Sequence, residues 1–273
     1  MKTITVANLE WALHMAEAAA LFGRPIDKGD EIGLLKSGLR GTQFQATGCL
    51  RWIWIQWLTT TPGETITARV EPFVERCLEM RVRCKCYDWL PQHDLMILVC
   101  AILASSDVQL TKVVETIADT YGDKGEKPVN NGELYAAAWC GMMKYWILGD
   151  LKKSSEEAGL IWGAYRDQLF CAATKPLVTP WLKRDWNAFL KAQQKDFEKL
   201  WGRARKDHST IYSENDAEIV VTIHNFQIEQ SWCWAHCGMA MLAHRQFGIE
   251  VATDPFWFPP HALKCVSRNS FSA

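Results

Sequence analysis

The sequence predicts an all-α protein: one domain over residues 1–273 in which antiparallel helical hairpins form an irregular, repeat-like stack with at most one short β element. Three observations favour this class. Apolar residues recur with the 3.6-residue period of a helix in nearly every long segment. Capping residues and glycines stand where several of these segments begin or end. Hydrophobic residues make up 48% of the chain, which is enough for a substantial core.

Helical period and end signals place helices along most of the chain. They are expected at residues 4–22, 31–60, 65–87, 92–105, 107–121, 132–148, 151–173, 179–206 and 231–247. The clearest lies between Thr179 and Lys206, where large apolar residues share one stripe and charged residues lie opposite. Thr179 and Pro180 suit a cap and the first helical position. The one strand signal is the β-branched run Ile219–Ile223.

Two of the predicted hairpins resemble each other. One turns at Ser106 and the other at Gly149, and each turn is followed directly by an aspartate. Gln109 stands three residues after Ser106 and completes the pattern of a capping box, while Gly122 suits the end of the same helix. Loops are expected at residues 26–31, 122–132 and 208–225.

Composition excludes several classes of function. A net charge of -1 argues against the broad basic surface that nucleic-acid binding requires. The 10 Cys are scattered through helical patterns, which is typical of free thiols in a reducing compartment. No uninterrupted apolar signal core begins the chain, and the apolar run Leu95–Ala104 is about half the ~20 residues of a membrane span. We therefore expect a cytoplasmic protein without nucleic-acid or membrane partners.

The segment QSWCWAHCGMAML raises a catalytic hypothesis, because it looks like the nucleophile segment of a papain-like cysteine peptidase. Cys233 stands at a predicted helix N-terminus, where the helix dipole lowers the pKa of a thiol. Gln227 has the spacing of an oxyanion donor, and His224 or His261 would serve as the base. A papain-like enzyme brings its base on a sheet after this helix, but little chain follows Cys233. We predict no catalytic residue and keep the cysteine hydrolase as the alternative.

A zinc site is the other chemical interpretation of this segment. Cys233 and Cys237 lie four residues apart on one helical face, and His244 and Cys265 follow. A structural zinc site needs four convergent Cys or His ligands, usually in more closely spaced pairs. Buried free thiols explain these cysteines better. We therefore predict no metal and no cofactor.

The C-terminal third carries a further resemblance. An apolar closing helix ends in Gly-Ile within Met239–Ile249, and the aromatic-proline segment DPFWFPPHALK follows at Asp254–Lys264. Upstream stand the helix-Asp-helix units DLMILVCAILASSDVQL and ELYAAAWCGMMKYWILGDLKK. These features resemble the all-helical immunity proteins of bacterial polymorphic-toxin systems, especially the immunity protein 49 family and the nuclease-immunity proteins called PoNi.

The resemblance implies a non-enzymatic cytoplasmic protein that binds a cognate toxin and neutralises it stoichiometrically. In these families the toxin is often a nuclease effector delivered by a secretion system such as type VI. No catalytic residues are carried over. Because helical hairpins share apolar patterns for packing reasons alone, a generic helical scaffold for an unrelated partner is a third interpretation.

Acidic residues in the predicted loops are the expected partner-binding positions. A toxin with a basic surface would be complementary to two acidic clusters. They comprise Asp27, Asp30, Glu31, Glu214, Asp216 and Glu218. The 14 Trp are expected mostly as packing anchors between helices, and any that lie on the surface would favour a homodimer contact.

Overall fold

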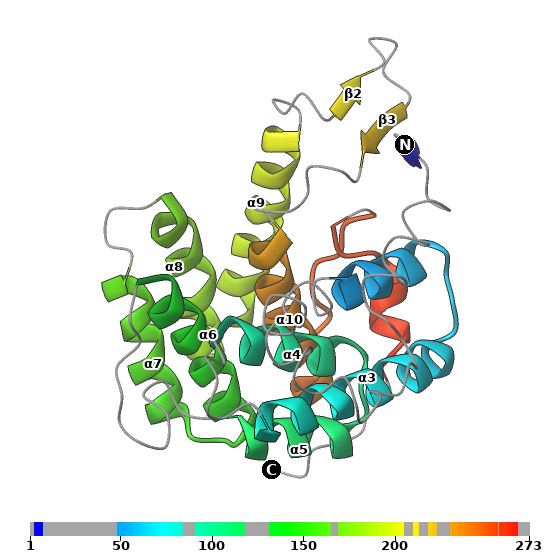
Figure 1. Ribbon diagram of the computed structural model, residues 1–273. Helices are drawn as coiled ribbons and strands as arrows, with labels where there is room; N and C mark the ends of the chain where they lie inside the picture. Colours follow the sequence, from blue (N-terminus) through cyan, green and yellow to red (C-terminus); the bar gives the residue numbers. More distant parts are fainter. Residues whose placement is uncertain are drawn as a thin grey trace.

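The computed structural model describes residues 3–7, 48–83, 91–117, 131–164, 169–204, 210–212, 218–222, 230–255 and 257–266. This part of the chain is mostly helical, which confirms the predicted all-α class (Figure 1). Residues 48–58 form the first helix. After it come α3 (Gly63–Arg83), α4 (Pro91–Ala104), α5 (Asp107–Thr116), α6 (Asn131–Ile147), α7 (Leu151–Ala164), α8 (Leu169–Leu182), α9 (Trp186–Ala204), α10 (Gln230–Phe247) and the 3-10 helix η2 (Pro260–Lys264).

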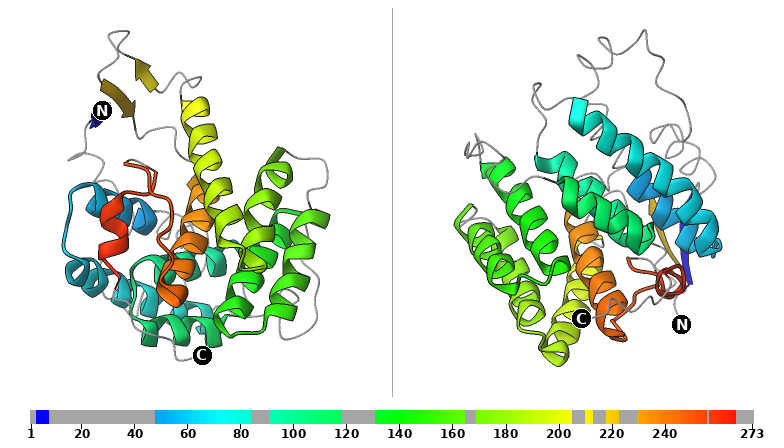
Figure 2. Two further views of the ribbon diagram at one scale, coloured as in Figure 1. Left: turned by 180° about the vertical axis from the view of Figure 1, so that it is seen from behind. Right: turned by 90° about the horizontal axis from the view of Figure 1, so that it is seen from below.

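Helix α10 occupies the centre of the stack. It packs on α4, α6 and α8. Views from several directions show it between α6–α9 on one side and residues 48–83 with α4 and α5 on the other (Figures 1 and 2). Helices adjacent in sequence pack on one another: α3 on α4, α4 on α5, α6 on α7 and α8 on α9. The predicted stack of helical hairpins is thus confirmed.

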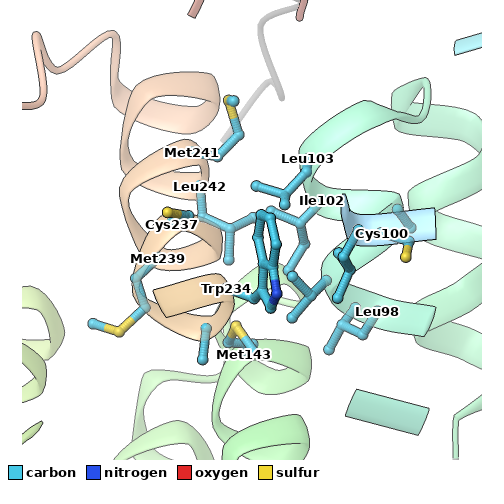
Figure 3. Packing of buried hydrophobic residues seen from close by; sticks show 14 of the residues in the cluster. Leu98, Cys100, Ile102, Leu103, Met143, Trp234, Cys237, Met239, Met241 and Leu242 are labelled. Carbon is cyan, nitrogen blue, oxygen red and sulfur yellow. The ribbon is translucent and has the colours of Figure 1, made fainter. Parts of the chain in front are cut away.

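The core is built around two helices that are apolar over most of their circumference. Every residue from Leu95 to Ala104 in α4 is buried, as is every residue from Trp234 to Arg245 in α10. Such helices are stable only when other elements cover their whole circumference. Figure 3 shows the indole of Trp234 between α10 and α4, beside Ile102, with Met143 of α6 close by. The expectation that the C-terminal helix is buried is therefore correct.

Both predicted hairpin turns lie where the sequence indicates. Ser106 is the N-cap of α5, and its Oγ accepts a hydrogen bond from the backbone N–H of Gln109 at 3.4 Å. Gly149 follows α6 with a φ of 79°, a backbone conformation that glycine adopts easily. Asp150 then caps α7, since its Oδ1 accepts a backbone N–H of the first turn at 3.0 Å.

One predicted helix start is wrong. Thr179 and Pro180 lie inside α8, and the next helix, α9, begins after Asp185. Asp185 is the cap of α9, because its Oδ1 accepts a backbone N–H one turn later at 3.1 Å. Tertiary packing overrides the proline signal: Trp181 is fully buried and its Nε1 donates to a backbone carbonyl of α10 at 3.1 Å. Helix α8 therefore extends past both residues.

Other helix ends also differ from the prediction. The helix expected over residues 151–173 is divided into α7 and α8, and α5 ends at Thr116, earlier than expected. Gly122 and the predicted loop 26–31 lie outside the described residues. The loop expected at 122–132 is described only where α6 begins. Periodicity locates helices more reliably than it locates their ends.

A small sheet accompanies the helices. Its strands are β1 (Thr3–Ala7), β2 (Thr210–Tyr212) and β3 (Glu218–Thr222), in the order β1-β3-β2. β1 is parallel to β3, and β2 is antiparallel to it. β3 overlaps the predicted strand Ile219–Ile223 at residues 219–222, but the other two strands were not expected. The helix predicted over 4–22 is wrong at its start, because TITVA begins with four consecutive β-branched residues in which polar Thr alternates with apolar Ile and Val.

The chain beyond α10 forms a strap, residues 248–255 and 257–266, that returns to the helix of residues 48–58. Gly248 has a φ of 65° and ends α10. Phe258 packs edge-on against Trp57, with ring centroids 5.8 Å apart. His261 Nε2 lies 2.7 Å from the carbonyl oxygen of Thr61. These contacts join the C-terminal segment to the first described helix.

Candidate binding surface

Cys233, the nucleophile of the hydrolase hypothesis, belongs to the first turn of α10. Its side chain, together with Gln227 and His224, lies outside the described residues. His261, the other candidate base, has its Nε2 at 2.7 Å from the carbonyl oxygen of Thr61. A carbonyl oxygen only accepts hydrogen bonds, so this nitrogen carries a proton and only Nδ1 could act as the base.

The three positions weighed as zinc ligands whose side chains are described, Cys237, His244 and Cys265, have separate hydrogen-bond partners. Cys237 Sγ donates to the carbonyl oxygen of Trp257 at 3.7 Å. His244 Nδ1 lies 3.0 Å from the carbonyl oxygen of Ile249, and Cys265 Sγ donates to a carbonyl of η2 at 3.3 Å. Within the described ranges, no three His, Cys, Asp or Glu side chains are grouped so that they could hold a metal ion.

Most described thiols lie in the core. The buried ones are Cys49, Cys77, Cys100, Cys140 and Cys237. Burial is the main cause that raises the pKa of Cys49, Cys77 and Cys140 above the ordinary thiol value. Burial also raises the pKa of the half-buried Cys265 thiol to about 11. The thiolate is the nucleophile, so these thiols are poor nucleophiles near neutral pH.

The acidic partner-binding positions fall mostly beyond the described chain. Asp27, Asp30, Glu31, Glu214 and Asp216 lie outside it. Glu218 is the first residue of β3 and pairs in register with Thr3 of β1. The prediction that Glu218 belongs to a loop is therefore wrong, because the β-branched residues after it extend the strand back to this position.

The large apolar side chains that are exposed in the described chain all lie at helix ends. Val108 is 81% exposed in the first turn of α5, Leu148 is 53% exposed after α6, and Phe247 is 38% exposed at the end of α10. Arg245 of α10 pairs with Asp107, the residue before Val108. That pair brings the end of α10 to the start of α5, so this end of the stack is the first place to look for a contact surface.

Four aromatic rings meet where α6, α8, α9 and α10 come together. Trp146 stacks on Trp181 with ring centroids 3.8 Å apart, and both are buried. Trp186, at the start of α9, lies 5.2 Å from Phe247 between ring centroids. Phe247 in turn packs edge-on against Trp146 at 6.0 Å. The two outer rings, Trp186 and Phe247, are thus supported by a base of two buried indoles.

Arg184 lies over this aromatic cluster. Its guanidinium carbon is 4.7 Å from the ring centroid of Phe247 and 5.5 Å from that of Trp146. The residue is exposed. A guanidinium on an aromatic face keeps its in-plane N–H donors available for a carboxylate. We call Arg184, Trp186 and Phe247 the turn-end surface.

Charges of both signs stand beside the aromatic rings. Lys183 and Asp185, the neighbours of Arg184 in sequence, are both exposed. The carboxylate of Asp185 accepts a backbone N–H as the cap of α9. This end of the molecule therefore combines supported aromatic rings with a mixed-charge rim, an arrangement found in protein interfaces.

Sequence reasoning missed the turn-end surface, although a signal exists. In both Leu148-Gly149 and Phe247-Gly248 a large apolar residue stands directly before a glycine with positive φ that ends a helix. A side chain in this position lies at the last turn, where the neighbouring helices also end. Few residues remain there to cover it.

Comparison with known proteins gives no relative: no family model, no curated protein and no solved structure matches the chain. Within the described ranges, no helix has the length and apolar character needed to span a membrane.

Proposed function

We propose that this protein is an immunity protein that binds a bacterial toxin directly and neutralises it without catalysis of its own. The observation that carries the proposal is the turn-end surface, in which the exposed Arg184 and Phe247 lie beside the half-buried Trp186. Aromatic residues and arginine dominate the binding energy of protein interfaces. The proposal takes a secreted nuclease effector as the toxin and the cytoplasm of the producing cell as the place of action.

The scaffold beneath the surface suits a stoichiometric inhibitor. Arg245 fastens α10 to α4 by donating to the carbonyl oxygen of Ile102 at 2.8 Å. His236 Nδ1 fastens α10 to α9, since it lies 2.5 Å from Asp196 Oδ2. A surface that is already ordered loses little conformational entropy on binding, so more of the contact energy contributes to affinity.

A second set of contacts belongs to the same proposal. A nuclease toxin with a basic face would be complementary to the acidic positions predicted from the sequence. These are Asp27, Asp30, Glu31, Glu214, Asp216 and Glu218.

Co-expression tests the proposal. The chain is produced together with the toxin-bearing product of the reading frame next to its gene, and bacterial growth is followed. We expect growth to be restored and the two proteins to elute as a 1:1 complex, measured by size-exclusion chromatography with light scattering. Absence of both protection and a complex would contradict the proposed function.

Cys233→Ala is the control that separates binding from catalysis. Protection by the variant should equal that by the parent, because neutralisation by contact requires no nucleophile. Under the hydrolase hypothesis the variant would lose protection, and a thiol-directed activity probe would label the parent but not the variant. Labelling that disappears in Cys233→Ala together with lost protection would replace the immunity proposal with the hydrolase.

A further inference from the structure

We draw no further inference here: the strongest candidate, the side-chain cluster between α9 and α10 in which His236 Nδ1 lies 2.5 Å from Asp196 Oδ2 one helical turn after Cys233, carries nothing, because the side chain of Cys233, which this pair would have to activate, lies outside the described residues.

Discussion

Arg245 and Arg184 lie at the same end of the helical stack, but their surroundings differ in almost every respect. Arg245 is 5% exposed, pairs with Asp107 and donates to the carbonyl oxygens of Ile102 and Ser105 at 2.8 and 3.1 Å. Burial lowers the pKa of its guanidinium from the ordinary value, and the bond to Asp107 offsets part of that change. Arg184 is exposed, rests on two aromatic rings and lies in strained backbone.

The difference separates an arginine that joins helices in the interior from one that lies exposed on aromatic rings. The terminal N–H groups of Arg245 are used within the protein, where they donate to carbonyls at the C-terminal end of α4. The donors of Arg184 face solvent after its aromatic contacts are made.

The largest loss of stability is expected when the buried arginine, Arg245, is replaced. Arg245→Met keeps the length of the side chain but removes every donor to Ile102, Ser105 and Asp107. We expect the free energy of unfolding to fall by about 3–5 kcal/mol, because one carboxylate and several carbonyls lose their partner in a buried place. Urea denaturation followed by circular dichroism measures the loss.

Arg184→Met is the matched control for that measurement. The exposed guanidinium makes only ring contacts, which are worth about 0.5–1 kcal/mol, and methionine retains part of them. The loss in unfolding free energy should therefore stay below about 1 kcal/mol. Similar losses in the two variants would remove the distinction between the two arginines.

The reactivity of a cysteine thiol also depends on how deeply the fold buries it. The pKa of the Cys265 thiol is raised by burial to about 11. At pH 8 only about 0.1% of it is ionised, so iodoacetamide should alkylate it roughly 100-fold more slowly than in the unfolded chain. The rate should increase about tenfold per pH unit up to roughly pH 10. Mass spectrometry of the labelled peptides gives the rate at each cysteine.

The raised pKa of the Cys265 thiol also makes the stability of the fold depend on pH. The unfolded chain releases the Cys265 proton at lower pH than the folded chain does. The stabilisation linked to the neutral thiol is therefore complete below the ordinary thiol pKa and is lost as the pH rises towards 11. Cys49, which is fully buried, should remain unlabelled while the protein is folded. A rate at Cys265 that is independent of pH would contradict the shift.

Much of the fold could be predicted because its causes are local. The period of apolar residues located the helices, and Ser106 and Gly149 marked two turns by their own conformational preferences. The start of α9 could not be predicted in the same way. Thr179 and Pro180 form a good local start signal, but burial of Trp181 against α10 keeps them inside α8. That contact joins residues far apart in sequence, which periodicity does not register.

The turn-end surface could not be predicted for a related reason. Trp186 and Phe189 share the apolar stripe of α9, but Phe189 is buried while Trp186 is only partly covered. Which of them reaches the surface depends on where the neighbouring helices end. The sequence also contains no sign that Arg184 adopts a positive φ, since arginine rarely does. Only the assembled helices bring Arg184, Trp186 and Phe247 together.

A pair of glycines tests close packing without any change of charge. A Cβ at Gly63 would lie 2.4 Å from the carbonyl oxygen of Cys265, so Gly63→Ala must push α3 away from η2. We expect it to lower the unfolding free energy by about 1–3 kcal/mol. At Gly238 the nearest atom is Met143 Sδ at 3.6 Å, an ordinary contact. Gly238→Ala should therefore be neutral or stabilise α10 by up to about 1 kcal/mol. Thermal unfolding of both variants checks the contrast, which fails if Gly238→Ala is the more damaging.

The smallest effect concerns the cap that holds Arg184 in place. Asp185 accepts the backbone N–H of Ala188 at 3.1 Å and so fixes the turn between α8 and α9. Asp185→Ala removes the acceptor and should lower the unfolding free energy by about 1 kcal/mol, whereas Asp185→Asn keeps an acceptor and should change it by only a few tenths. Urea denaturation measures both. If Asp185→Asn lowers the unfolding free energy as much as Asp185→Ala does, the carboxylate stabilises the turn through its charge. Its partners would then be the neighbouring cations, Lys183 and Arg184.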